Sequence, residues 1–305
     1  MRHISNKPAA RAVRYRIATI CFTAFGLAAA PATAQQAPGP DRPAPAEPTA
    51  LPNLDRDMVT LGAMGAYMPD YEGSSHYRME PAPVGIGSIK GYSFVLTGNQ
   101  LIVDLIRTKP GPNWNFHVGP IASVNFNRSS LKDIEDLRVR ALGKRSAALE
   151  LGGVVGVSKT GVMTSPYDTL TVSLSYRHDV TDVHDSGIWQ PNIAYYTPVS
   201  IKAAVGLYGS AEIVEDGYAR SYYSVSAAQS AASGLAIYDA KGGLKNWNVG
   251  LIGAYSLTGN LLHGLKLVGT GSYGRVVNSI GRSPLVKDVG SQDQWLGAVG
   301  LAYTF

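Results

Sequence analysis

Alternation of apolar and polar residues over long segments constrains this chain more than any other feature of its sequence. Residues 114–126 place Trp, Phe, Val, Pro and Ala on one face and mostly Asn, His, Gly and Ser on the other, with Ile121 as the exception. Residues 169–177 repeat the pattern. Because successive side chains of a strand point to opposite faces, each segment is predicted to be a β-strand with one apolar face.

The length of these segments distinguishes between two all-β architectures. Many of them reach 10–13 residues, whereas strands in globular proteins average about 5–6. A tilted strand needs ~9–11 residues to cross a bilayer. The polar faces carry Ser, Thr, Asn and Gly more than Lys and Glu. An antiparallel transmembrane β-barrel, apolar outside and polar inside, is therefore favoured over a soluble sandwich.

About twelve strands are predicted, and an even number places both termini of the chain on the same side of the membrane. Short and long connections alternate along the chain, as they do in outer-membrane barrels, and only the 98–99 turn breaks this alternation. The predicted strands are 58–67, 82–90, 92–97, 100–106, 114–126, 146–158, 167–178, 188–197, 200–213, 244–257, 262–274 and 294–305.

The beginning of the chain is typical of an exported protein. Five basic residues and no acidic one precede an apolar run, and Ala32 and Ala34 occupy the small-residue positions of a cleavage site. Residues 1–34 are predicted to be a signal peptide cut after Ala34. The run is too short for a retained membrane helix, which needs ~20 residues. Residues 35–56, rich in Pro and Ala, are a predicted flexible linker, and residues 57–305 form the barrel.

Composition excludes several functions once the signal peptide is set aside. The chain has 27 Lys+Arg and 22 Asp+Glu, and five of the basic residues lie in residues 1–34, so the remainder is formally neutral. The basic balance is therefore no argument for nucleic-acid binding. The one cysteine, Cys21, lies in the signal peptide. No disulfide, cysteine metal site or cofactor is expected in the remainder.

Five motifs point to a known family. Four of them are "GAYMPDYEGSSHYRMEPAPVG", "HDSGIWQPNIAYYTPVS", "RSPLVKDVGS" and the terminal "GLAYTF". With "YARSYYSVSAAQSAASGLAIYDAKGGL", they resemble the MltA-interacting protein (MipA/OmpV) family of Gram-negative outer-membrane β-barrel proteins, in the family's order. The motif residues singled out are Pro69, Asp70, Tyr71, Gly73, Ser74, His184, Gly187, Ser283 and Pro284.

The resemblance implies a location, a route of assembly and partners. It implies a place in the outer membrane, among lipid and lipopolysaccharide. The last strand, with Tyr303 and Phe305 on its apolar face, looks like the signal read by the barrel assembly machinery. The family is understood to hold a murein lytic transglycosylase and a murein synthase together. The implied function is a non-enzymatic scaffold for cell-wall enzymes.

The first motif also allows a hydrolase reading. Ser74 or Ser75 could be a nucleophile, His76 its base and Asp70 or Glu72 the orienting acid. Residues this close along one loop rarely reach the geometry of a triad. A polar loop that fixes the chain's return to the barrel is favoured.

Two other polar segments have functional alternatives. Residues 178–185 hold two His and three Asp, but their spacing fits no standard metal site, so no metal is predicted. They are His178, Asp179, Asp182, His184 and Asp185. The charged loop 127–145 could contact lipopolysaccharide phosphates through arginine, although a solvated loop is favoured. His117 is predicted to face the lumen, hydrogen-bonded to its neighbours.

Three functions remain open from the sequence. The scaffold is the first, and a small-solute channel or a surface adhesin of the outer membrane is the alternative. Twelve strands leave a narrow lumen that loops can plug, so an open channel is not a necessary consequence of the fold. An outer-membrane hydrolase is the least favoured function.

Overall fold

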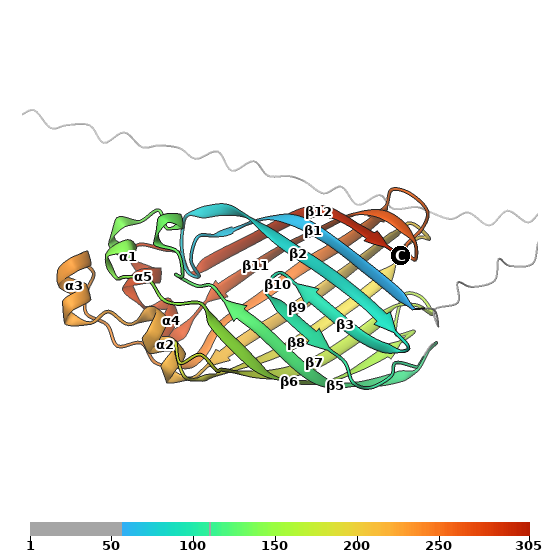
Figure 1. Cartoon of the computed structure of the whole chain (residues 1–305), viewed down its shortest axis with the longest axis horizontal. Helices are drawn as coiled ribbons and strands as arrows, with labels where there is room; N and C mark the ends of the chain where they lie inside the picture. Colours follow the sequence, from blue (N-terminus) through green and yellow to red (C-terminus); the bar gives the residue numbers. More distant parts are fainter. Residues whose placement is uncertain (1–56, 110) are drawn as a thin grey trace, which may run out of the picture. The chain divides into compact units, whose positions relative to one another are not determined.

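The structure, a computed structural model, describes residues 57–109 and 111–305. The predicted signal peptide, with Ala32 and Ala34, and the linker lie outside the described residues. Twelve antiparallel strands form a closed barrel in which each strand pairs with its sequence neighbour and β1 pairs with β12 (Figure 1). They are β1 Met58–Pro69, β2 Tyr77–Ile89, β3 Tyr92–Thr97, β4 Gln100–Val103, β5 Trp114–Asn125, β6 Ala148–Thr160, β7 Thr169–Asp179, β8 Gly187–Pro198, β9 Ala203–Val214, β10 Gly243–Ser256, β11 Gly264–Val276 and β12 Asp293–Thr304.

The predicted number and order of strands are confirmed, but most predicted boundaries differ from the observed ones. β2 begins at Tyr77 rather than at 82, because the chain before Pro81 still pairs with β1 throughout. β4 ends at Val103 rather than at 106. There the carboxylate of Asp104 accepts the N–H groups of Ile106 and Val118, which takes the chain out of the strand ladder.

The outer surface of the barrel is apolar along every strand. Phe116, Leu251 and Val299 are 64%, 61% and 58% exposed, and the register places all three on the outward face. Leaving such a side chain exposed to water, rather than burying it, costs about 1.5–3 kcal/mol of free energy. The prediction of an apolar exterior is therefore confirmed, and a lipid surround is what makes this surface stable.

Aromatic side chains form two bands on the outer surface, one toward each end of the strands. In one band Trp247, Tyr273 and Trp295 pack against one another across β10, β11 and β12, with ring centroids 5.6 Å and 4.9 Å apart. At the other end Tyr303 and Phe305 meet at 4.9 Å. Amphipathic aromatic rings concentrate at the two interfaces of a bilayer. The bands therefore mark the membrane boundaries.

The inner surface has two different walls. The inward residues of β7–β11 are mostly polar, including Ser173, Asn192, Ser210, Asn248 and Ser272. The inward residues of β12 and β1–β4 are mostly apolar. These are Leu296, Ala298, Met64, Ala66, Ala82, Val84, Ile86, Val95 and Ile102. The prediction of a polar interior was therefore wrong for this second wall, called the apolar wall below.

The long connections fold together at one end of the barrel, where the helices in Figure 1 gather. These segments, 70–76, 126–147, 180–186, 215–242 and 277–292, are called the cap, and the opposite end is the turn end. The cap contains a 3-10 helix, η1 Leu131–Asp133, and the α-helices α1 Leu137–Ala141, α2 Asp216–Tyr223, α3 Ala227–Ser233, α4 Asn278–Gly281 and α5 Pro284–Lys287. Within the described residues, no helix is both long and apolar enough to span a membrane.

Two apolar clusters hold the cap together and against the barrel mouth. One joins Tyr222 of α2 to Ile188 and Val214 at the ends of β8 and β9. The other joins Ile134 and Val139 of the 126–147 segment to residues of α5 and its neighbours. The prediction that loop 127–145 is merely solvated was wrong, because Ile134, Val139 and Leu142 are almost fully buried. A short helix in this loop is confirmed.

Candidate functional site

Five charged side chains form a buried network beneath the cap. Arg177 of β7 contacts Glu150 of β6 at 2.6 Å and Glu212 of β9 at 2.5 Å. Lys245 of β10 contacts Glu212 and lies 2.6 Å from Glu72 of the first cap segment. Two cations thus bridge three carboxylates, and this set is called the charge network. It joins four barrel strands to the cap through Glu72.

Lys245 reaches the network because of an irregularity in β10. The pairing of β9 with β10 shifts register between Leu244 and Asn246, so Lys245 is the extra residue of a bulge. Its side chain is only 3% exposed. Strand alternation alone does not predict where such a residue points, which is why the sequence did not reveal it.

Tyrosines of α2 complete the coordination of Glu72. The hydroxyl groups of Tyr218 and Tyr223 donate to Glu72 Oε2 at 3.0 Å and 2.9 Å, and the Asn246 amide donates to Oε1 at 3.1 Å. Burial, with the adjacent Glu72 carboxylate, raises the pKa of both tyrosines well above 10. They therefore stay protonated donors at neutral pH, and Glu72 has its hydrogen bonds satisfied.

His184 connects the network to the segment between β7 and β8. It is buried, with Nδ1 2.8 Å from Ser186 Oγ and Nε2 3.4 Å from Glu150 Oε1. Its ring meets that of Tyr218 edge-on, at 5.1 Å between centroids. His184 is therefore a structural member of the cap.

The first family motif is bonded to the last cap segment. The Tyr71 hydroxyl donates to the Leu285 carbonyl at 2.8 Å, and the Ser74 backbone pairs with Gly290. Burial raises the pKa of Tyr71, so it also remains a donor. Gly73 has φ +96°, which L-residues with side chains rarely adopt, and a Cβ there would lie 2.7 Å from Val286. The two segments therefore lie in direct contact.

Other motif residues extend this contact. Asp70 Oδ2 accepts the backbone N–H of Glu135 at 2.9 Å, and Ser283 Oγ donates to the Tyr223 carbonyl at 2.6 Å. Ser283 also caps α5, and Pro284 is its buried first residue. Ser283 thus links α5 to α2. Asp70 links the first cap segment to the 126–147 segment.

The remaining predicted residues lie apart from this cluster. Pro69 is the last residue of β1, and Gly187 donates its N–H to Glu215 at 2.7 Å. Tyr303 and Phe305 lie at the turn end. Their proposed role in assembly remains a prediction.

The geometry does not bring together a serine and a histidine side chain in the first motif. Ser74 Oγ accepts the backbone N–H of His76 at 3.0 Å, Ser75 is exposed, and the His76 ring lies 3.8 Å from Glu135. A nucleophile needs a base within hydrogen-bond reach. This arrangement offers none to either serine.

The His/Asp segment 178–185 is also dispersed. His178 lies 3.5 Å from Asp185 at the surface, while Asp179 accepts the backbone N–H groups of Val183 and His184 at 2.7 Å each. Across residues 57–109 and 111–305, no three His, Cys, Asp or Glu side chains are placed to hold a metal ion. Asp179 instead shapes the turn that places His184.

Two carboxylates organise the turn end. Asp104 lies 2.6 Å from His117 Nδ1, and Ser158 Oγ lies 2.8 Å from Nε2, which confirms that His117 faces the lumen with hydrogen-bonded neighbours. Asp168 accepts the N–H groups of Val162 and Thr164 and the Tyr195 hydroxyl. Although burial opposes it, these bonds lower the pKa of Asp168.

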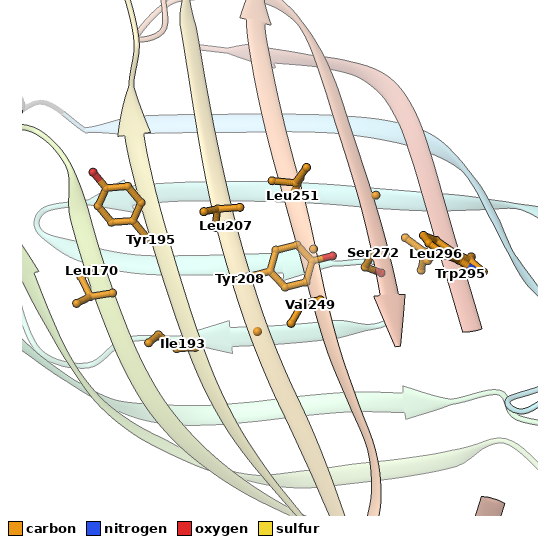
Figure 2. Close-up of a pocket in the computed structure, with 13 residues that line it drawn as sticks. Leu170, Ile193, Tyr195, Leu207, Tyr208, Val249, Leu251, Ser272, Trp295 and Leu296 are labelled. Atoms are coloured by element: carbon orange, nitrogen blue, oxygen red, sulfur yellow. The ribbon is translucent and has the colours of Figure 1, made fainter. Parts of the chain in front are cut away.

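A shallow depression crosses the wall from β7 to β12 (Figure 2). Leu207, Val249 and Leu251 project outward around Gly209 and Gly271, which have no side chains to fill the space. Its outward face belongs to the lipid-facing surface. Its lining is mostly apolar, and Tyr195, Tyr208, Ser272 and Trp295 are the residues with polar side-chain atoms, so it offers little to orient a polar ligand.

The family model of the MltA-interacting protein MipA matches residues 61–305. The chain belongs to this family. It is an outer-membrane barrel whose cap contains most of the singled-out motif residues, which are Asp70, Tyr71, Gly73, Ser74, His184, Ser283 and Pro284. No curated protein matches the sequence.

Several solved outer-membrane barrels are similar in shape. An outer-membrane channel of Pseudomonas putida F1 is 13% identical with a TM-score of 0.39, over 87% of this chain and 100% of that one. The Pseudomonas putida toluene transporter TodX is 9% identical with a TM-score of 0.33, over 82% and 89%. OmpT of Vibrio cholerae is 10% identical with a TM-score of 0.28, over 82% and 97%.

The sequence analysis missed the charge network. Glu150, Arg177 and Glu212 lie on the inward face of predicted strands, where a charge in a membrane barrel needs a partner. That signal was available in the strand alternation. The partner Lys245 was not, because the bulge reverses its expected direction.

Proposed function

We propose that the protein is a non-enzymatic barrel that works by binding other proteins at its turn end, as a scaffold for murein-remodelling enzymes. The family is named for interaction with MltA, a murein lytic transglycosylase, and this name supports the choice of partner. We place the turn end in the periplasm, where short connections lie in outer-membrane barrels. The predicted signal peptide agrees with export to this compartment.

The observation that carries the proposal is the cap. It closes one mouth of the barrel with two packed apolar clusters and anchors Glu72 in the charge network. Removing one partner of such a buried ion pair costs about 3–5 kcal/mol. A barrel with one end closed by such stable contacts is better suited to binding partner proteins than to conducting solutes passively.

The turn end offers a surface for such partners. Its exposed apolar residues include Leu105, Met163, Val199 and Ile201, which are 60%, 69%, 60% and 77% exposed. Basic side chains lie among them, and Lys159 also contacts the Pro112 carbonyl and the Trp114 ring. Apolar residues ringed by charge are typical of protein-binding surfaces.

The test is a pull-down from envelopes with the tagged full chain. Wild type is expected to recover a lytic transglycosylase and a murein synthase, and the double variant Met163→Ser/Ile201→Ser is expected to recover less of both. A matched variant at the cap, Ile237→Ser, changes a residue that is 67% exposed and should leave recovery unchanged. If wild type recovers no cell-wall enzyme, the scaffold proposal is wrong.

A small-solute channel is the second candidate, and one observation favours it. Ile86 and Ile252 point inward yet are 54% and 46% exposed, so the barrel is hollow toward the turn end. A channel would require the cap to open. Conductance that appears only after the cap is loosened would support this alternative.

Assembly and the surrounding lipid complete the proposal. Phe305 is 66% exposed on the outward face beside Tyr303. This position is compatible with both a lipid-facing anchor and a signal for the assembly machinery. Lipopolysaccharide would meet the exposed basic residues of the 126–147 segment, such as Arg138 and Lys144.

A further inference from the structure

The barrel wall is incomplete between β2 and β5. The intervening hairpin of β3 and β4 turns at Gly98 and Asn99, and Figure 1 shows β3 confined to the turn-end part of the barrel while β2 continues toward the cap. The β2–β3 pairing runs only from Val84 to Ile89. Within the described part of the chain, Tyr77–Ala82 of β2 therefore has a strand partner on the β1 side only.

The borders of this gap follow from hydrogen bonds. The hairpin tip is tied to both neighbours, since Gly98 N–H donates to the Pro83 carbonyl and Val124 N–H to the Asn99 carbonyl. Strands are spaced about 4.8 Å apart, so β2 and β5 stand roughly 14 Å apart at the tip. Toward the cap the gap is bounded by the 126–147 segment, where Arg78 contacts Asp133 at 3.2 Å. We call this opening the window.

Two prolines reduce the number of unpaired backbone groups on the open edge of β2, where Met79 keeps its N–H. The carbonyl of Pro83 faces β3, and alternate residues direct their backbone groups to the same edge, so Pro81 does too. Neither proline has an N–H to leave unpaired. An unsatisfied backbone group in lipid costs several kcal/mol. The prolines also prevent pairing with a further strand, which argues against a protein partner at this edge.

The outward side chains on both sides of the window are apolar. Met79 on β2 and Phe126 after β5 are 63% and 55% exposed. Immediately inside, Ala82 and Val84 begin the apolar wall, which continues through Ile86 and Val95. Nearer the cap, the inward residues of β2 are charged, since Arg78 contacts Glu80 at 2.8 Å and Asp133 at 3.2 Å. The apolar path therefore lies beside the hairpin tip, from Ala82 onto the apolar wall, whereas the wall formed by β7–β11 is polar.

We propose that the window admits the acyl chain of a membrane lipid from the bilayer into the barrel, where it lies on the apolar wall. The lipid is the occupant because the window opens within the membrane, between the two aromatic bands. The proposal requires the membrane barrel and does not require the scaffold role. It explains why one wall of the lumen is apolar.

Tryptophan quenching by brominated lipid tests the proposal. The four tryptophans of the chain are replaced by Phe, and the full barrel is reconstituted in vesicles of phosphatidylcholine brominated on its acyl chains. Single tryptophans are then introduced by Thr97→Trp, which faces inward at the hairpin tip, and by Leu96→Trp, which faces the lipid. Ser210→Trp, inward on the polar wall, is the matched control.

The two possible outcomes are distinct. The proposal expects Thr97→Trp to lose emission nearly as much as Leu96→Trp, while Ser210→Trp keeps its emission. If Thr97→Trp is quenched no more than Ser210→Trp, no acyl chain enters and the proposal is overturned. Retention of the heat-dependent gel shift shows that each variant is folded.

A second variant closes the window. Lengthening the β3–β4 hairpin by two residues in each strand, together with Pro81→Thr, supplies the missing strand and restores an N–H to pair with it. This change should remove most of the quenching of Thr97→Trp. Quenching that persists in the lengthened barrel would mean that lipid reaches this position by another path, which would also overturn the proposal.

Discussion

Lys245 Nζ lies 2.6 Å from Glu72 Oε1, and this contact joins the barrel wall to the cap. Glu72 comes from the connection after β1, while Lys245 comes from the bulge in β10. In the charge network as a whole, two cations contact three carboxylates, and two tyrosine hydroxyls donate hydrogen bonds to Glu72. The cap is thus fastened by charge at its centre and by apolar packing around it.

Loss of Lys245 is the first prediction. Lys245→Met should destabilise the folded barrel by about 3–5 kcal/mol, because Glu72 then loses its cation and Glu212 keeps only Arg177. The measurement is the urea concentration at which half of the protein loses the fast-migrating band of the folded, unboiled barrel on a gel. Lys241→Met, which removes an exposed pair with Asp239, should change this midpoint little. Equal effects of the two changes would argue against a structural charge network.

Close contact between the first and last cap segments gives the second prediction. A Cβ on Gly290 would lie 2.0 Å from the Gly73 carbonyl oxygen, so Gly290→Ala should cost about 1–3 kcal/mol by overpacking. Limited proteolysis of the cap should accelerate. Gly297→Ala is the matched control, since a Cβ there meets nothing within 4 Å. Equal protease resistance in the two variants would contradict the contact.

The sequence predicts the strands of the barrel much better than it predicts the cap. Alternation gave twelve strands because each must place an apolar face in lipid, and this constraint acts on every second residue. The cap was not predicted, because α2 is a short helix stabilised by contacts with distant segments such as Ile188 and Val276. Short helices of this kind leave little periodicity in the sequence.

The motif residues show the same limit. Asp70 and Ser74 were read as a polar loop, and their neighbours along the chain gave no sign of Glu135 or Gly290, which they contact. Only the three-dimensional closure of the barrel brings these segments together. The apolar wall was missed for a different reason. An apolar residue such as Met64 or Ala82 does not show from its type alone whether it faces the lipid or the lumen.

Acid dependence of the turn end is the third prediction. The pKa of Asp168 is lowered in the folded state, so its contribution to stability is present above the usual aspartate pKa of about 3.9 and is lost as the pH falls below it. Wild type should therefore be more stable than Asp168→Asn at pH 7, and the difference should shrink toward pH 2. Thermal midpoints of the gel shift at several pH values measure this. A difference independent of pH would refute the assignment.

The end of the last strand gives the fourth prediction. Phe305→Ala should lower the amount of heat-modifiable barrel in outer-membrane fractions, because Phe305 provides both lipid contact and the proposed assembly signal. Phe126→Ala is the control, since Phe126 is 55% exposed at the other end of the barrel. Equal amounts of assembled Phe305→Ala and Phe126→Ala would mean that Phe305 has no special part in assembly.

The most direct test of a barrel that binds rather than conducts is single-channel recording on the purified, folded protein in planar bilayers. The closed cap predicts a silent wild type, and Lys245→Met, measured in parallel, shows whether a loosened cap lets current pass. Discrete conductance steps from wild type would contradict the account, because they would show that the cap does not close the barrel.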